Sequence, residues 1–294
     1  MRSEKIRNKE GRKPGGAGSG FAGKEKRLRV LVFGDVVGKP GRRALRELVP
    51  LWRKKYKVDY CIANVENLAH GDGITPKTLQ EILDAGVDYC TSGNHILKKN
   101  GTEMLADPSI PVLRPANFPA TAPGRGAALV SVGTFRLLLI NLIGTAFFKE
   151  GETYSNPFAA VDQILKEHKD EKPNGVIVDW HAEATSEKVA MGWHLDGRVS
   201  AVFGTHTHVP TTDLRILPQG TAFRTDLGMT GLRDHVLGVD REVIVHNFVQ
   251  PDDHVRFAWP DDGATQAHAV LLDIDPATGK AAAACALDHD FPSL

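Results

Sequence analysis

From Leu28 onward, short apolar runs alternate with longer segments of helical periodicity. The runs "LRVLVF", "VDYCIANV" and "VDYCTSG" have the β-branched and aromatic composition of buried strands. Between them, "RRALRELVPLWRKKY" and "TPKTLQEILDAG" repeat apolar residues at the spacing of amphipathic helices. This order is typical of a parallel sheet covered by helices. Further strands are predicted at "FRLLLINLIG", "NGVIVDW" and "VSAVFG", with a helix at "NPFAAVDQILKEH" between the first two.

The pattern changes after about Asp213. Only short strand-like pieces follow, namely "TAFRTDLG", "REVIVHNF", "HVRFAW" and "AVLLDID", and no segment has a convincing helical period. We therefore expect a largely antiparallel second sheet in this region. A chain of 294 residues is long enough for one large α/β domain or two small ones, and we favour a single domain over residues 27–294.

Residues 1–26 differ from the rest of the chain. They are rich in Lys, Arg and Gly and lack an apolar core segment, which predicts a disordered N-terminal tail rather than a signal peptide or an anchor. Elsewhere no apolar run approaches the roughly eighteen residues of a membrane span, so no membrane partner is expected.

Charge and cysteine content narrow the class further. The chain has 36 basic and 36 acidic residues, so net charge indicates no partner class, and a nucleic-acid partner is possible but unsupported. The three cysteines are odd in number and lack the C-x-x-C spacing, which argues against disulfides or a zinc ribbon and fits a cytoplasmic protein. Cys61 and Cys90 lie in strand-like runs and are interpreted as small buried hydrophobes.

Polar residues with metal-binding chemistry follow five of the predicted strands. The carboxyl ends of parallel strands converge on one crevice, so these side chains should meet there. They are Asp35, Glu66, Asn67, Asn94, His95, His181, His206 and His208.

The set combines oxygen and nitrogen ligands without sulfur, which suits Mn, Fe or Zn. It is large enough for two ions, and a pair of metals bridged by a carboxylate and a hydroxide is a common device for hydrolysing phosphate esters. His206 and His208 are separated only by Thr207. In an extended turn, residues i and i+2 point the same way, so both imidazoles could reach one dinuclear centre.

Eight stretches of the sequence together resemble the YmdB-like metallophosphoesterases, a bacterial branch of the calcineurin-like phosphoesterase superfamily. They are "GDVVGKPGR", "ENLAHGDGIT", "SGNH", "RPANFP", "HAEATSEK", "GTHTH", "TDLGMTG" and "LGVDRE". The resemblance covers the chain from about Leu28 and implies a four-layer α/β/β/α sandwich. It also implies two divalent or trivalent metal ions, iron or manganese, and hydrolysis of phosphodiesters, notably 2′,3′-cyclic nucleotides.

The resemblance also assigns roles to particular residues. Glu66 would bridge the two ions, and His95 would be the proton donor. One ion would be surrounded by Asp35, Glu66, Asn67 and His208, and the other by Glu66, Asn94, His181 and His206. Glu183 and Ser186, within "HAEATSE", are interpreted as supporting or turn residues rather than catalytic ones.

One segment departs from the family pattern. After Gly-Asn-His, relatives usually carry an aromatic and then an acidic residue, whereas this chain reads Ile96-Leu97-Lys98-Lys99. This departure favours an alternative, a regulatory protein that binds metal and nucleotide with little turnover. A hydrolase of phosphomonoesters or other esters would use the same ligands. A homo-oligomer is also possible.

Overall fold

The computed structural model describes residues 27–148 and 153–292, so the predicted N-terminal tail lies outside the described residues. Two six-stranded sheets face each other. The first contains β1 (Leu28–Val36), β2 (Tyr60–Asn64), β3 (Tyr89–Thr91), β10 (Met229–Leu232), β11 (Thr265–Ile274) and β12 (Ala281–Phe291). The second contains β4 (Ala127–Val132), β5 (Phe135–Ile143), β6 (Gly175–His181), β7 (Ala201–Thr205), β8 (Arg215–Ile216) and β9 (Ala222–Arg224).

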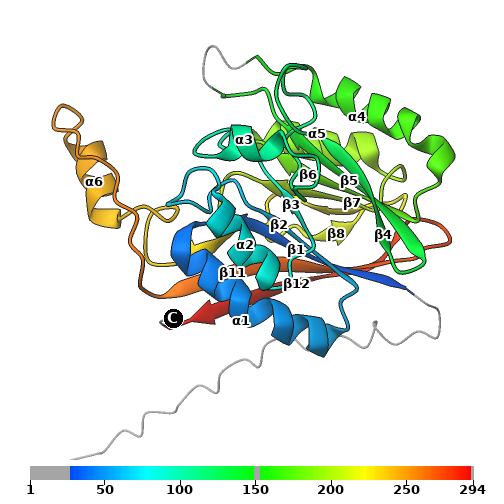
Figure 1. Cartoon of the computed structure of the whole chain (residues 1–294), viewed down its shortest axis with the longest axis horizontal. Helices are drawn as coiled ribbons and strands as arrows, with labels where there is room; N and C mark the ends of the chain where they lie inside the picture. Colours follow the sequence, from blue (N-terminus) through cyan, green and yellow to red (C-terminus); the bar gives the residue numbers. More distant parts are fainter. Residues whose placement is uncertain (1–26, 149–152, 293–294) are drawn as a thin grey trace, which may run out of the picture.

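Helices lie on the outer faces of the two sheets, except for the last one, which projects away from them (Figure 1). They are α1 (Gly38–Tyr56), α2 (Pro76–Asp84), α3 (Gly101–Leu105), α4 (Pro157–Glu167), α5 (Thr185–Leu195) and α6 (Arg241–Val249), with a 3-10 turn at Lys169–Glu171. The strand orders are β12-β11-β10-β1-β2-β3 and β4-β5-β6-β7-β9-β8. Strands β1, β2 and β3 are parallel, as are β5, β6, β7 and β9. The predicted four-layer α/β/β/α sandwich is confirmed.

Three hydrophobic layers separate these four layers of structure, and the alternation along β1 shows how the sequence builds two of them. Leu31 and Phe33 point to the helix side, where Phe33 stacks on Trp52 of α1 with ring centroids 5.6 Å apart. Val30 and Val32 point the other way, into the core between the sheets. Because successive strand residues face opposite sides, a strand that is apolar throughout must be buried on both faces.

The third layer lies between the second sheet and its helices. Along β5, Leu138 and Ile140 belong to this layer, with Trp180 of β6 and Met191 of α5. Intervening Leu139 belongs to the core between the sheets. The central strands of both sheets are therefore fully covered, which explains their near-continuous apolar runs.

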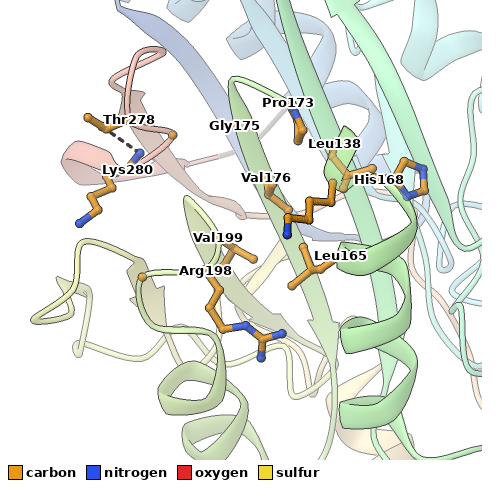
Figure 2. A pocket seen from close by; sticks show the side chains of 13 residues that line it. Leu138, Leu165, His168, Pro173, Gly175, Val176, Arg198, Val199, Thr278 and Lys280 are labelled. Carbon is orange, nitrogen blue, oxygen red and sulfur yellow. Dashed lines mark hydrogen bonds between the residues drawn. The ribbon is translucent and has the colours of Figure 1, made fainter. Parts of the chain in front are cut away.

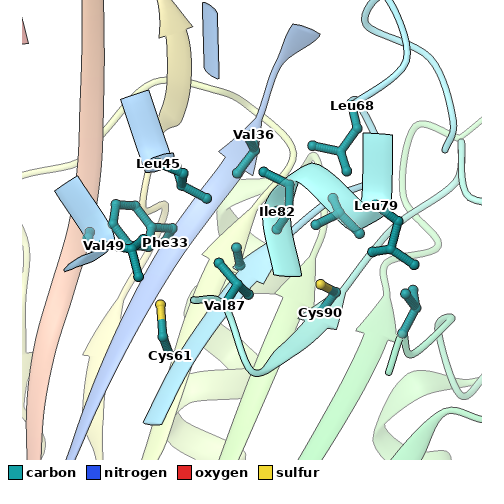
Figure 3. Packing of buried hydrophobic residues seen from close by; sticks show 14 of the residues in the cluster. Phe33, Val36, Leu45, Val49, Cys61, Leu68, Leu79, Ile82, Val87 and Cys90 are labelled. Atoms are coloured by element: carbon teal, nitrogen blue, oxygen red, sulfur yellow. The ribbon is translucent and has the colours of Figure 1, made fainter. Parts of the chain in front are cut away.

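Cys61 and Cys90 are fully buried in the core below α1 and α2 (Figure 3). Burial raises the pKa of both thiols, because the thiolate would lose its hydration. Their predicted role as small buried hydrophobes is confirmed.

The prediction of a separate antiparallel sheet after Asp213 is wrong. The strands of this region divide between the two sheets, with β8 and β9 extending the second and β10, β11 and β12 extending the first. β11 runs antiparallel to β1, pairing Leu28 with Ile274 and Phe33 with Ala269. The backbone of β1 needs hydrogen-bond partners along both of its edges. β2 supplies them along one edge, and the C-terminal strands β10 and β11 supply them along the other.

The segment "REVIVHNF" is also predicted wrongly, since it forms helix α6 rather than a strand. The Asp240 side chain accepts hydrogen bonds from the backbone N–H groups of Glu242 and Val243, which caps the helix. Asn247 exchanges two hydrogen bonds of 2.8 Å with the backbone of Val255. This local capping outweighs the β propensity of the two valines and the isoleucine in this segment. The stretch "HVRFAW" that follows forms no strand.

Within residues 27–148 and 153–292, each helix is too short or too polar to cross a bilayer.

Candidate metal centre

The ends of five parallel strands carry the residues that the sequence analysis singled out. Asp35 is the penultimate residue of β1, and Glu66 and Asn67 follow β2. Asn94 and His95 follow β3, His181 ends β6, and His206 and His208 follow β7. β1, β2 and β3 belong to one sheet and β6 and β7 to the other, so the cluster forms where the carboxyl ends of both sheets meet.

One half of the cluster is centred on His181, which is fully buried. Its Nε2 atom lies 3.3 Å from Oε1 of Glu66 and 3.2 Å from Oδ1 of Asn94. Nδ1 of His206 is 3.0 Å from the same His181 nitrogen. Glu66, His181 and His206 can each point one ligand atom at a common centre, so these three could hold a metal ion.

The other half of the cluster joins Asp35, Asn67 and His208. Nε2 of His208 lies 3.2 Å from Nδ2 of Asn67 and 3.9 Å from Oδ1 of Asp35. Asn67 Nδ2 in turn lies 3.4 Å from Glu66 Oε1. Glu66 thus contacts both halves, and the structure brings all seven predicted ligands into one cluster.

Gly93 of the "SGNH" motif is required by the packing against His181. A Cβ atom at this position would lie 2.1 Å from Nε2 of His181. Non-bonded atoms in proteins do not approach so closely, so a side chain here would push the His181 imidazole out of the cluster. The "SGNH" motif identifies this glycine in the sequence, but its packing partner, His181, is 88 residues away along the chain.

A hydrogen-bond chain behind the cluster orients His181. The Thr205 hydroxyl lies 2.9 Å from Nδ1 of His181 and 2.7 Å from Oδ1 of Asp179, which is buried and accepts further hydrogen bonds from Thr91 and Asn64. Since the carboxylate only accepts, the hydroxyl donates to Asp179 and accepts from N–H at Nδ1. The lone pair of the neutral ring is therefore on Nε2, which faces the cluster.

The sequence analysis missed this chain. Asp179 and Thr205 belong to strands that read as apolar runs, "NGVIVDW" and "AVFGTH". Asp179 is two residues before His181 and faces the same side of β6. Thr205 of β7 lies directly beside His181 in the pairing of β6 with β7. A polar residue at i−2 of a predicted ligand is the signal that could have found Asp179.

The prediction of an extended turn at His206–His208 is wrong. His206 has φ of 98° and His208 has φ of 64°, both in the left-handed region that non-glycine residues rarely adopt. The backbone N–H of His206 donates to Oδ2 of Asp35 at 3.0 Å, and that of Thr207 donates to Asp226 at 3.1 Å. Two carboxylates therefore hold the loop in a strained shape, and strain of this kind concentrates at functional sites.

Asp226 is itself held by a buried lysine. Lys188 is fully buried, and its ammonium lies 2.5 Å from Asp226 and 2.6 Å from the carbonyl oxygen of Thr205. Both residues lie in quoted motifs, "HAEATSEK" and "TDLGMTG", yet nothing in the sequence pairs them. Because Asp226 also accepts from the backbone N–H of Thr207, the ion pair stabilises the loop that carries His206 and His208.

Glu183 contacts the cluster directly. Its Oε2 atom lies 3.1 Å from Nε2 of His206, on the side of the ring away from His181. The carboxylate accepts from N–H at Nε2, so Nδ1 of the neutral ring offers its lone pair to the cluster.

His95 lies at the exposed edge of the cluster, with 32% of its side chain accessible. Its Nδ1 atom lies 3.1 Å from Oδ1 of Asn67 and 3.4 Å from Oδ1 of Asp72. Its backbone N–H donates to Oε2 of Glu66 at 2.9 Å. Because both side-chain neighbours of Nδ1 are oxygen acceptors, that nitrogen carries the proton and the opposite nitrogen, Nε2, is left for a substrate.

The departing segment Ile96–Lys99 forms the wall next to His95. Ile96 is fully buried in the core below α1 and α2, whereas Lys98 pairs with Asp72 at 2.8 Å. Asp72 therefore contacts both His95 and Lys98. Lys98 thus brings a positive charge to Asp72, which also contacts His95.

Burial and neighbouring charge shift the pKa values within the cluster in opposite directions. Burial alone would lower the pKa of His181, but Glu66, Asp35 and Asp179 raise it to about 9. Burial and the charge on His181 lower the pKa of His206 to about 3. Burial opposes ionisation of Glu66, yet His181 and His95 together lower its pKa well below the usual range. The carboxylates thus favour positive charge on His181, whereas burial and His181 disfavour it on His206.

Two buried polar atoms without hydrogen-bond partners also indicate that the donor set fits a cation. Oδ1 of Asp35 is completely buried and has no hydrogen-bond partner among the described residues, and the same holds for Nδ1 of His208. Burial also raises the pKa of Asp35, as expected for an uncompensated carboxylate. An unpartnered buried carboxylate oxygen is costly unless a cation completes its surroundings.

The fold and this donor set define a protein of the metallophosphoesterase type, an α/β/β/α sandwich with a histidine, carboxylate and amide cluster where its two sheets meet. The chain belongs to the YmdB-like family, because the model of that family, described as "YmdB-like protein", matches residues 31–286. The resemblance inferred from the eight motifs is confirmed.

Relatives of known sequence or structure support this membership. The chain is 45% identical over 254 residues to a 2′,3′-cyclic-nucleotide 2′-phosphodiesterase of Bacillus subtilis, covering 86% of this chain and 94% of the relative. A structure described as a novel phosphatase of Mycoplasma pneumoniae superposes with a TM-score of 0.84 at 31% identity, covering 90% and 94%. A hypothetical protein of Thermus thermophilus gives 0.82 at 38% identity, covering 90% and 100%.

Proposed function

We propose that this protein is a cytoplasmic, dinuclear metal-dependent phosphodiesterase that hydrolyses 2′,3′-cyclic nucleotides. The observation that carries the proposal is the pair of donor groups that share Glu66, with Asp35 Oδ1 buried and unpartnered beside them. The substrate class is supported by the name of the 45% identical relative, nearly the whole length of which aligns with this chain.

The two halves of the cluster support the following assignment of ligands. Glu66 is the shared residue. Asp35, Asn67 and His208 would complete one site, and Asn94, His181 and His206 the other. The hydrogen bonds described above support lone pairs at Nε2 of His181 and Nδ1 of His206, as metal ligation requires. The oxygen and nitrogen donors suit iron or manganese.

When bound, the two ions would lower the pKa of a water molecule between them and offset the negative charge of the phosphoryl oxygens. The protein itself supplies the proton for the leaving group. Asn67 holds the imidazole of His95 through Nδ1, so a proton on Nε2 of the protonated ring can pass to the departing ribose oxygen. The partial exposure of His95 lets it meet a substrate that enters from solvent.

A substrate panel tests the proposal. Protein purified without chelator is analysed for metal, then assayed on 2′,3′-cyclic AMP, bis-p-nitrophenyl phosphate and p-nitrophenyl phosphate with added manganese or iron. We expect about two equivalents of metal and turnover of both diesters, with the monoester slower. Faster turnover of the monoester would instead assign the site to a phosphatase.

The second candidate is a regulatory protein that binds metal and nucleotide with little turnover. The observation in its favour is Lys98, whose ion pair with Asp72 places a fixed positive charge next to the proposed proton donor. In this case the panel would give full metal content and tight nucleotide binding but negligible hydrolysis. Removing the positive charge beside His95 with Lys98→Glu would then raise the rate.

A further inference from the structure

A cleft of about 790 Å³ opens between the "RPANFP" segment and the chain that precedes α4. The family motif "RPANFP" has no role in the chemistry proposed above. Described residues that line the cleft include Arg114, Ala116, Phe118, Pro119, Tyr154 and Ser155.

A row of aromatic rings connects this cleft to the histidine cluster. The ring of Phe148 lies 5.2 Å from that of His206, with the planes tilted by 41°. Tyr154 meets Phe148 edge-on at 5.7 Å and stacks on Phe118 at 5.2 Å with the planes 7° apart. Aromatic faces of this kind bind nucleobases by stacking, with little preference for the base.

The chain that carries Phe148 is anchored at its start. Glu187 of α5 accepts hydrogen bonds from the backbone N–H and the hydroxyl of Thr145, at 2.9 and 3.1 Å, and from the backbone N–H of Ala146 at 3.4 Å. The position of the row relative to the cluster is therefore set by the fold, because β5 and α5 both belong to the second half of the sandwich.

Arg114 supplies the cleft with a positive charge that no described carboxylate neutralises. The residue is only 9% exposed, its Nη1 atom donates to the backbone carbonyls of Pro115 and Ala116, and its buried Nε atom has no partner. Burial lowers the pKa of Arg114, with no opposing charge. A buried guanidinium without a counter-ion is unfavourable, and an anionic ligand would relieve it.

A second cavity, in contrast, is lined by an arginine whose charge is paired with a carboxylate. A cavity of about 310 Å³ lies at the opposite ends of β6 and β7 and is also bordered by basic residues, including Arg198 (Figure 2). There Arg198 pairs with Asp162 at 2.6 Å, and His168 lies 3.8 Å from Glu171. These two charges are partnered within the protein, and the lysines that also line this cavity, Lys169 and Lys280, are exposed to solvent. The described residues of its lining therefore include no buried cation without a partner.

We propose that the cleft is a nucleotide subsite, in which the base stacks along Phe148 and Tyr154 and a second phosphate, on the 5′ side of the nucleoside, binds Arg114. This inference rests on the proposed function, since the scissile cyclic phosphate would occupy the metal centre. The preferred substrate is then a 5′-phosphorylated nucleotide, either a free 5′-phosphate or the internucleotide phosphate of an RNA fragment ending in a 2′,3′-cyclic phosphate.

Comparison of three substrates tests the subsite in the unaltered protein. They are 2′,3′-cyclic AMP, its 5′-phosphorylated form, and the dinucleotide ApA ending in a 2′,3′-cyclic phosphate. We expect kcat/KM to be about 10- to 100-fold higher for the two substrates with a second phosphate, the range for a hydrogen bond to a charged group. Preference for the dinucleotide alone would identify the internucleotide phosphate as the ligand. Equal values for all three would overturn the proposal.

Variants then locate the phosphate and the base. Arg114→Gln should abolish the preference for a second phosphate and leave 2′,3′-cyclic AMP turnover unchanged. The control is Arg125→Gln, because the Arg125 side chain donates to the Tyr89 hydroxyl. This variant should keep the preference. Phe148→Ala should raise KM for all three nucleotides about 5- to 100-fold but leave ribose 2′,3′-cyclic phosphate, which has no base, unaffected. Loss on the base-free substrate as well would show that Phe148 merely supports His206.

A binding measurement separates failure of the subsite from failure of the proposed function. Calorimetric titration of the metal-free protein with 5′-phosphorylated ApA requires no turnover. Binding that Arg114→Gln weakens by about 10-fold or more supports the subsite even if no diester is hydrolysed. Hydrolysis of 2′,3′-cyclic AMP together with equal binding of the dinucleotide by both proteins would refute the subsite and leave the proposed function intact.

Discussion

The Thr205 hydroxyl lies 2.9 Å from Nδ1 of His181 and makes the opposite ring nitrogen the one that can bind a metal. This contact is buried and its other end is held by Asp179. It links the proposed metal centre to the polar residues between the two sheets, and it accounts for a threonine at the end of β7 where the rest of the strand is apolar.

Removing the hydroxyl should therefore weaken metal binding. Thr205→Val keeps the shape of the side chain but frees His181 to adopt either tautomer, so we expect metal affinity to fall about 10- to 100-fold. Competition with a chelator of known affinity measures the change. Thr205→Ser retains the hydroxyl and serves as the matched control. Equal affinity in the valine and serine proteins would contradict the orienting role.

Glu66→Gln should abolish turnover while preserving the fold. The amide has the size of the carboxylate but lacks the charge that holds two cations together, so we expect the rate on bis-p-nitrophenyl phosphate to fall at least about 100-fold. Circular dichroism and the thermal midpoint verify folding. A folded Glu66→Gln protein with retained turnover would rule out the dinuclear mechanism.

His95→Ala should affect substrates according to their leaving group. A ribose oxygen needs a proton as it departs, whereas p-nitrophenolate does not, so we expect a loss of about 10²- to 10⁴-fold on 2′,3′-cyclic AMP and a much smaller loss on bis-p-nitrophenyl phosphate. Metal content should not change. Equal losses on both substrates would limit His95 to positioning the phosphate.

His206→Ala and His208→Ala should each impair a different metal site. His206 contacts His181, and His208 contacts Asn67 on the opposite side of Glu66. Loss of one imidazole should lower the affinity of its ion by at least about 10- to 100-fold, so each variant should hold about one equivalent at limiting metal. Elemental analysis gives the stoichiometry, and anomalous diffraction identifies the vacant position. Loss of the same ion in both variants would refute the ligand assignment.

The buried pair of Lys188 and Asp226 should contribute to stability. Lys188→Met leaves a buried carboxylate without its partner, and we expect the free energy of unfolding to fall by about 3–5 kcal/mol. Urea unfolding at neutral pH measures the loss. The double variant with Asp226→Leu removes both charges and should recover much of it. A single variant as stable as the parent protein would show that the loop does not depend on this pair.

Local pattern in the sequence was sufficient for much of the first half of the fold. Strands such as β1 and β6 are buried on both faces, so their composition is mainly apolar, and the helices between them repeat with a helical period. The parallel order then places Asp35, Glu66 and His181 at one end of the sheets, because parallel strands all end on the same side. The set of candidate ligands follows from this rule and from the chemistry of the side chains alone.

The tertiary structure decided what depends on distant partners. Strand β11 lies beside β1 although more than 200 residues separate them, and no local signal encodes that pairing. The left-handed backbone of His206 and His208 depends on hydrogen bonds to Asp35 and Asp226. The physical reason is the same in each case: a buried hydrogen bond or ion pair between residues far apart in sequence outweighs the local preference of the chain.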